Sequence, residues 1–237
     1  MSMPAFAPLF QPFPWICKGV RVMSITTECD RDALVEAVPG ELVVNSRGLA
    51  FVNVIEYGVI GGASPYHEFV MTVPCRYGED HRGVYCLWIY VDSDNAMTGG
   101  REIFGVPKKM ADIAMGWHGD QLVASATRSG VTFGTVGMTL DKECADDYLP
   151  TIAAGFGTPM WGLRAFAGHD GTTTVREIAE AGADAVVHRA VEGRAFVDFR
   201  PSAADPLHRF GAQAVRALYY ELDLVMRTPK LLVDTRG

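Results

Sequence analysis

The sequence predicts an α+β fold that is mostly antiparallel β sheet with a few short helices. Runs rich in Val, Ile, Tyr and Phe recur along the chain and are bounded by Gly, Pro and Asp, which is typical of strands. Stretches with helical periodicity are few and short. No linker, repeat or low-complexity tract interrupts the 237 residues. We therefore expect a single domain over residues 1–237, closed as a meander or barrel.

The first half of the chain is expected to begin with a short helix and to continue with strands. Asp30 is a candidate N-cap, apolar residues follow it at helical spacing, and Pro39-Gly40 marks the end of the helix. Strand signals dominate after it, over residues 49–60, 68–73 and 84–91.

The second half continues the same pattern. A short helix is expected over 94–103 and ends before Gly105 and Pro107. A hairpin turn at His118-Gly119-Asp120 joins strands expected over 110–117 and 122–126. Further strands are predicted over 131–140, 184–191, 195–199 and 214–225.

Composition and charge exclude several classes of partner and location. The net charge of −7 argues against nucleic acid or an anionic membrane as a partner. The N-terminus lacks the basic head and apolar run of a signal peptide, and the longest apolar runs, such as 84–91, are too short to span a bilayer. The 5 cysteines are an odd number without Cys-x-x-Cys spacing, which favours buried thiols in a reducing compartment. We expect a cytoplasmic protein.

Motifs for metals and organic cofactors are missing from the sequence. The 6 histidines show no His-Glu-x-x-His or paired spacing, which argues against a metal site. Gly155-Phe156-Gly157 does not continue as a dinucleotide fingerprint, and there is no P-loop or Gly-x-Ser-x-Gly elbow. We expect no cofactor.

The segment 101–109, which reads REIFGVPKK, carries the strongest chemical signal. Spacing alone favours an ordinary interpretation, in which Lys108 and Lys109 are two solvent-exposed basic residues after a proline turn. Three features favour a reactive site instead: the flanking residues are apolar, Pro107 fixes the direction in which the chain leaves the turn, and carboxylates occur in the same half of the chain. A lysine that attacks a carbonyl to form a Schiff base must be neutral, and apolar surroundings or a nearby positive charge favour that form.

The geometry of a strand constrains how such a pair works. If Lys108 and Lys109 begin a strand, their side chains point to opposite faces. Repulsion between them is then too weak to hold an amine neutral, so we expect burial of one lysine to do most of that work. This hypothesis predicts a modest loss of activity in Lys109→Met and complete loss in Lys108→Met.

These residues resemble the acetoacetate decarboxylase family. Its signature is a Gly-Arg-Glu followed by a Pro-Lys-Lys, here at 100–102 and 107–109. The resemblance extends over nearly the whole chain, through Arg21 ahead of the 32–34 and 38–39 segments, the SPYHE segment at 64–68, and the C-terminal segments 223–224 and 231–234. It implies the fold of that family, a β-barrel or meander with a few short helices.

The resemblance also implies roles for individual residues. Lys108 would be the Schiff-base nucleophile and Lys109 the neighbour that helps to hold it neutral. Glu68 would be a carboxylate beside the lysine, and Arg21 would sit at the pocket entrance and orient the substrate carboxylate. Glu56 is the candidate for a second pocket glutamate, although its spacing to Glu68 is shorter than in the family. The alternatives are a surface arginine at 21 and an outward-facing strand residue at 56.

The resemblance implies a Schiff-base lyase that decarboxylates a small β-keto acid such as acetoacetate. The segments 151–157 and 159–164 and Val106 depart from the pattern of decarboxylases, so two alternatives remain. One is an aldolase-dehydratase that acts on pyruvate and an aldehyde, with a donor among Tyr66, Tyr148 and Trp161. The other is a non-catalytic ligand-binding relative. Exposed sheet edges and the Pro-rich N-terminal arm predict a homo-oligomer.

Overall fold

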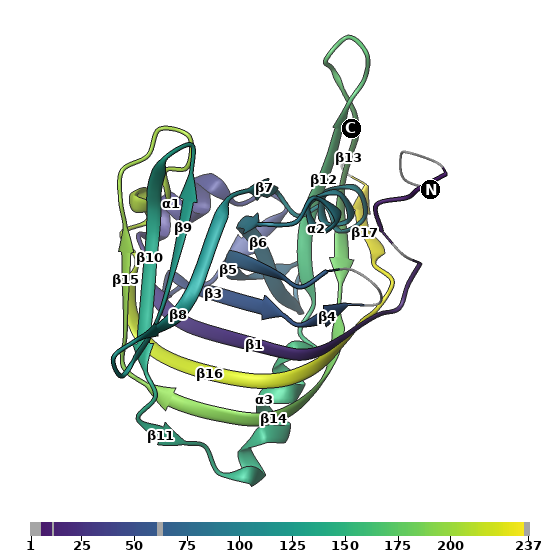
Figure 1. Ribbon diagram of the computed structural model, residues 1–237. Coiled ribbons are helices and arrows are strands. Elements are labelled where there is room, and N and C mark those ends of the chain that lie inside the picture. The colour runs from purple at the N-terminus through teal and green to yellow at the C-terminus, as the bar shows by residue number, and fades with distance from the viewer. Residues whose placement is uncertain (1–5, 11, 61–63, 235–237) are drawn as a thin grey trace.

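The computed structural model describes residues 6–10, 12–60 and 64–234, and strands dominate it (Figure 1). The strands of the first half are β1 (Trp15–Glu28), β2 (Leu42–Val44), β3 (Leu49–Tyr57), β4 (Val59–Ile60), β5 (Tyr66–Tyr77), β6 (His81–Val91) and β7 (Lys108–Met110). The second half contributes β8 (Asp112–His118), β9 (Gln121–Arg128), β10 (Val131–Thr139), β11 (Lys142–Glu143), β12 (Met160–Ala167), β13 (Thr173–Ala181), β14 (Ala183–Gly193), β15 (Ala195–Phe199), β16 (Gln213–Met226) and β17 (Lys230–Asp234). The helices are α1 (Arg31–Ala37), α2 (Asp94–Gly99) and α3 (Leu149–Phe156), with a π-helical turn Gly100–Phe104 and 3₁₀ turns Asp146–Tyr148 and Leu207–Phe210.

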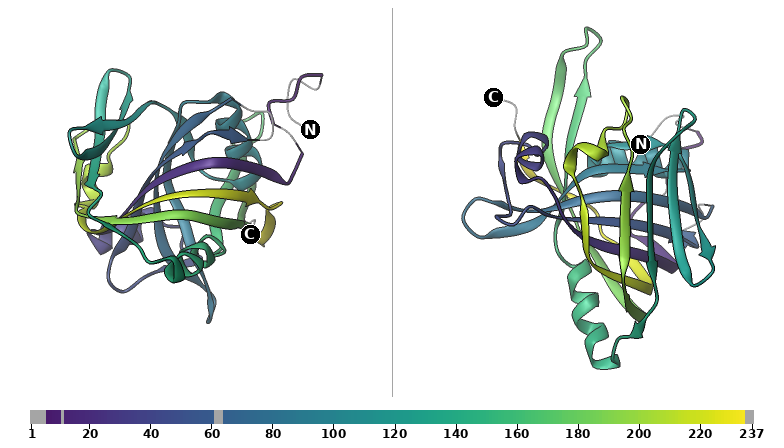
Figure 2. Two further views of the ribbon diagram at one scale, coloured as in Figure 1. Left: turned by 60° about the horizontal axis from the view of Figure 1, so that its bottom comes forward. Right: turned by 90° about the vertical axis from the view of Figure 1, so that its left-hand side faces the viewer.

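The strands form two sheets. Within the described residues the larger has 13 strands, with the order β11-β14-β16-β1-β3-β5-β6-β12-β13-β17 and with β2, β4 and β7 attached to β5, β1 and β6. The smaller has the order β15-β10-β9-β8 and lies in front of the larger in the right-hand view of Figure 2. Pairing is antiparallel except where β6 meets β7 and β12. The predicted fold class, mostly antiparallel β with short helices, is confirmed.

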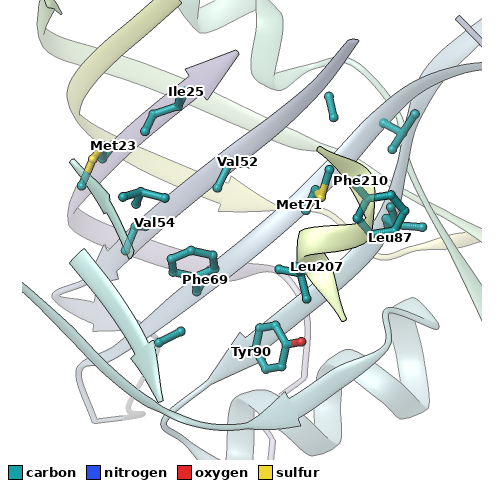
Figure 3. Packing of buried hydrophobic residues seen from close by; sticks show 14 of the residues in the cluster. Met23, Ile25, Val52, Val54, Phe69, Met71, Leu87, Tyr90, Leu207 and Phe210 are labelled. Carbon is teal, nitrogen blue, oxygen red and sulfur yellow. The ribbon is translucent and has the colours of Figure 1, made fainter. Parts of the chain in front are cut away.

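The two faces of the larger sheet pack against different parts of the chain. Side chains alternate between faces along a strand, and one face packs against the smaller sheet. Its core includes Met23, Val54 and Phe69 of the larger sheet (Figure 3). Phe133 of β10 packs in the same cluster, and all four residues are at most 1% exposed. The opposite face carries a second apolar cluster, to which α3 contributes Ile152. This second face bounds the cavity described below. No helix in the described ranges is long and apolar enough to cross a membrane.

Several predicted elements were found close to their expected bounds. The Asp30 side chain accepts hydrogen bonds from the first-turn amides of α1, as a cap should, and Gly119 has the left-handed φ of 66° that the hairpin turn requires. The elements β1, β12, β13 and α3 are among those that were not predicted. β1 is interrupted by Lys18, Gly19 and a register shift, and it is held as a strand by pairing with β3 on one side and β16 on the other.

A buried carboxylate joins the strands at the far edge of the larger sheet. Glu180 of β13 is 7% exposed and accepts hydrogen bonds from the Trp161 indole at 3.0 Å and from Lys230 at 2.9 Å, with His81 at 2.5 Å. Burial acts to raise the pKa of Glu180, but these hydrogen bonds outweigh it and lower that pKa to about 2. Glu180 therefore links β6, β12 and β17 through its ionised form.

Replacing Glu180 with Gln should destabilise the fold and change how stability depends on pH. We expect the free energy of unfolding at pH 7 to fall by about 1–3 kcal/mol. A depressed folded-state pKa stabilises above the ordinary value of 4.5, and this stabilisation is lost as pH falls towards about 2. Urea unfolding at pH 7 and pH 3 should show the difference between wild type and Glu180→Gln shrinking at pH 3; an unchanged difference would contradict this role.

Candidate active site

A tight turn before β7 places the Lys108 side chain on the second face of the larger sheet, the face that bounds the cavity. The π-helical turn is capped by Gly105, whose φ of 68° is left-handed, and β7 begins three residues later beside β6. Gly100 supplies the space for the lysine, because a Cβ built there would lie 2.4 Å from the Lys108 Cδ atom. The Arg101 guanidinium donates to the Lys108 carbonyl at 3.2 Å and holds the turn against the strand.

Lys108 and Glu68 form a buried ion pair. The Lys108 Nζ atom lies 2.5 Å from Glu68 Oε1, and the two residues are 8% and 5% exposed. A buried charge without a partner is costly, so each group depends on the other. The short contact also means that one proton can pass between amine and carboxylate without rearrangement of the backbone.

Two tyrosines complete the polar cluster around Glu68. The Tyr66 hydroxyl donates to Oε1 at 3.1 Å and the Tyr57 hydroxyl to Oε2 at 3.5 Å, while their rings stack with centroids 4.7 Å apart. Burial and then the Glu68 charge raise the pKa of both tyrosines well above the usual range. Burial and the same charge raise the pKa of the nearby Cys17 thiol to about 12. These three groups therefore remain protonated near neutral pH.

Lys109 points to the other face, as strand alternation predicts. Its Nζ atom lies 2.8 Å from Asp205 Oδ1 and 4.7 Å from the centre of the Trp88 ring. Asp205 is 1% exposed and also accepts from Tyr90 at 3.1 Å and Arg128 at 3.2 Å. Lys109 thus holds β7 in place through its ion pair with Asp205, on the face of the sheet opposite Lys108.

Arg21 and Glu56 are not brought to Lys108. They pair with each other across β1 and β3, and neither lines the cavity into which Lys108 opens. Their strand neighbours Val22 and Ile55 do line it, so alternation turns the charged pair to the opposite face. The expected roles of Arg21 at the pocket entrance and of Glu56 as a second pocket glutamate are therefore not supported by the geometry.

A cavity of about 1220 Å³ extends from Lys108 and Glu68 along the second face of the sheet. Its floor is formed by β1, β3, β5 and β16, and α3 contributes Ile152 and Phe156. Phe104 and Trp15, with ring centres 5.4 Å apart, line the end beside the lysine. Of the expected aldolase donors, Tyr66 and Tyr148 line this cavity and Trp161 does not.

The sequence pointed to Lys108 and Glu68, which the structure brings together, but not to Tyr57 and Asn53, which line the same cavity. Both face the cavity from β3, together with Ile55. The signal that could have found them is the alternation of side chains along a strand. Because Ile55 pairs with Glu68, residues 53, 55 and 57 of β3 lie on the same face of the sheet as the Glu68 carboxylate. That register is set across strands and cannot be read from β3 alone.

Comparison with known proteins shows which family this chain resembles along nearly its whole length. The family model described as acetoacetate decarboxylase (ADC) matches residues 2–235. Acetoacetate decarboxylase 1 of Bradyrhizobium diazoefficiens is 28% identical over 236 residues, which cover 98% of this chain and 92% of the relative.

Solved structures show the same fold. A crystal structure of acetoacetate decarboxylase from Legionella pneumophila has a TM-score of 0.92 at 21% identity and covers 100% of this chain and 94% of that chain. The enduracididine biosynthesis enzyme MppR, complexed with the condensation product of pyruvate and imidazole 4-carboxaldehyde, has a TM-score of 0.83 at 16% identity and covers 99% of this chain and 96% of that chain. At these identities the likeness concerns the fold.

Proposed function

The chain belongs to the acetoacetate decarboxylase family, and from this we propose that it is a Schiff-base lyase that decarboxylates a β-keto acid. The observation that carries the proposal is the buried pair of Lys108 and Glu68, with 2.5 Å between Nζ and Oε1, at one end of an apolar cavity. A buried amine beside a proton acceptor is what imine formation with a ketone requires.

The first half of the reaction forms the imine. Lys108 transfers one proton to Glu68, and the free amine attacks the ketone carbon to give a carbinolamine. Protonated Glu68 returns the proton to the carbinolamine hydroxyl, which leaves as water, and a protonated imine remains. Tyr66 and Tyr57 orient the Glu68 oxygens throughout, because each donates to a different oxygen.

The second half uses the imine as an electron sink. The bond between the α-carbon and the carboxylate breaks, carbon dioxide leaves, and the electron pair forms an enamine. A proton supplied by water adds to the enamine carbon in place of carbon dioxide, and a water molecule then hydrolyses the imine to free the ketone and Lys108. Val22, Val70 and Ile89 line the cavity near the lysine. This apolar setting favours loss of the carboxylate, because the charge is poorly solvated before the bond breaks.

A second candidate is an aldolase-dehydratase that uses the same imine on pyruvate and an aldehyde. The cavity volume favours it, because about 1220 Å³ leaves room for two reactants. The hydroxyl of Tyr148, which lines the cavity, would be the donor to the aldehyde oxygen.

Borohydride trapping separates these functions. Intact-mass measurement after incubation with sodium borohydride and either acetoacetate or pyruvate should give a stable adduct with wild type, and none with Lys108→Ala. Release of carbon dioxide from the β-keto acid would support the decarboxylase, and consumption of pyruvate only with an aldehyde present would support the aldolase-dehydratase. Absence of any adduct would leave a ligand-binding relative.

A further inference from the structure

The cavity is much larger than a four-carbon keto acid needs. Pockets of about 300–1,000 Å³ hold drug-sized ligands, and this one measures about 1220 Å³. Building on the proposed function, we infer that the substrate is a β-keto acid with an extended chain that carries an uncharged hydrogen-bonding group, and that Asn53 binds this group.

Polar side chains occur along the whole cavity floor, beyond the lysine as well as beside it. Cross-strand pairing arranges its side chains in three rows. The first row, level with the Glu68 carboxylate, is Glu68, Ile55, Val22 and Tyr220; the second is Val70, Asn53, Ser24 and Leu218; the third is Thr72, Phe51, Thr26 and Arg216. Successive rows lie two residues, or about 6.7 Å, apart along the strands. A chain that leaves the imine along this floor therefore passes Ile55 and Val22 and then meets the amide of Asn53 and the hydroxyl of Ser24 in the second row.

Asn53 is the polar group of the second row that offers both donors and an acceptor to the cavity. Its side chain is half-buried, lines the cavity and makes no hydrogen bond to any described residue. In the third row Arg216 is paired with Glu192 at 2.6 Å. The amide of Asn53 offers both donors and an acceptor, so it suits a hydroxyl or carbonyl rather than a charged group.

The distance between Glu68 and Asn53 sets the length of chain that should separate the ketone from the hydrogen-bonding group of the substrate. Asn53 lies one strand and one row from Glu68, a separation of about 8 Å. A chain of about five carbons between ketone and hydroxyl covers this span. 8-Hydroxy-3-oxooctanoate has this form, and 3-oxononanoate is its matched partner with a methyl group in place of the hydroxyl.

The test compares kcat/KM for these two acids and for acetoacetate in wild type, Asn53→Leu and the control Gln121→Leu. Gln121 is exposed on β9, outside the residues that line the cavity, and undergoes the same change from amide to isobutyl side chain. Wild type and control should prefer both long acids to acetoacetate by at least about tenfold, and the hydroxy acid to its methyl partner by about three- to tenfold. In Asn53→Leu the preference between the long acids should reverse.

Three outcomes would overturn the inference: no preference for long chains, no preference for the hydroxyl group in wild type, or equal behaviour of Asn53→Leu and the control. Calorimetric binding of 7-hydroxyheptan-2-one and octan-2-one to Lys108→Met separates this inference from the proposed function, because no imine forms there. Tighter binding of the hydroxy ketone without turnover of any acid in wild type would keep Asn53 as the residue that binds the hydroxyl group, and would reject both the decarboxylase and a β-keto acid as the substrate.

Discussion

Replacing Lys108 with Met should lower the rate of decarboxylation by a factor on the order of 10⁴ or more, because the nucleophile of a covalent mechanism is removed. At about 1.36 kcal/mol per decade this is at least about 5 kcal/mol of lost transition-state stabilisation. Methionine is close to lysine in length and fits the space beside Gly100. The loss should therefore appear in kcat and in borohydride trapping, with a normal far-UV spectrum, whereas the unfolding midpoint should fall because Glu68 loses its buried partner.

Lys109→Met is the matched comparison, because it removes the same charge one residue away. Lys109 is bound to Asp205 on the other face, so the reacting amine keeps its Glu68 partner in this variant. We expect a rate within about tenfold of wild type and a stability loss of about 1–3 kcal/mol, because buried Asp205 retains Arg128 and Tyr90. Near-equal loss of activity in the two variants would contradict a division of roles by strand face.

The division of roles shows which parts of the site a sequence can specify. A local motif, Pro107 followed by two lysines, was enough to predict the turn and, on the condition that the lysines begin a strand, the opposite orientation of Lys108 and Lys109. Arg21 and Glu56 were misplaced because their orientation depends on the register of β1 against β3. A shift of one residue in that register exchanges the two faces, and nothing within either strand reveals it.

Pairing between strands also decided which parts of the fold could be predicted from the sequence. Strands with dense β-branched and aromatic runs, such as β6, were predicted from composition alone. β13 reads TTVREIAEA, which lacks that density, and it is held in the sheet by pairing with β12 and β17 and by buried Glu180. Its conformation is therefore a consequence of tertiary contacts and not of local preference.

Replacing Glu68 with Gln should slow imine formation by a factor of about 10²–10³, a range typical of lost general acid–base catalysis. Glutamine has the same shape, and its oxygen can still accept a hydrogen bond from Tyr66, but it cannot take a proton from Lys108 or return one to the carbinolamine. Substrate binding should change little, because the chain of the keto acid lies along β1, β3 and β5. The loss should therefore fall on kcat and on the single-turnover rate of borohydride trapping.

Tyr66→Phe supplies the control for this interpretation. It removes the 3.1 Å hydrogen bond to Glu68 but leaves the carboxylate able to exchange a proton with Lys108 at 2.5 Å. If Glu68 acts as a proton carrier, Tyr66→Phe should lose less than about tenfold, in line with one neutral hydrogen bond. If Glu68 only holds Lys108 in position, the glutamine variant should trap ketone nearly as fast as wild type, since its amide oxygen can still accept from Lys108. A Glu68→Gln variant that behaves like Tyr66→Phe would therefore remove Glu68 from the chemistry and leave it as a positioning residue.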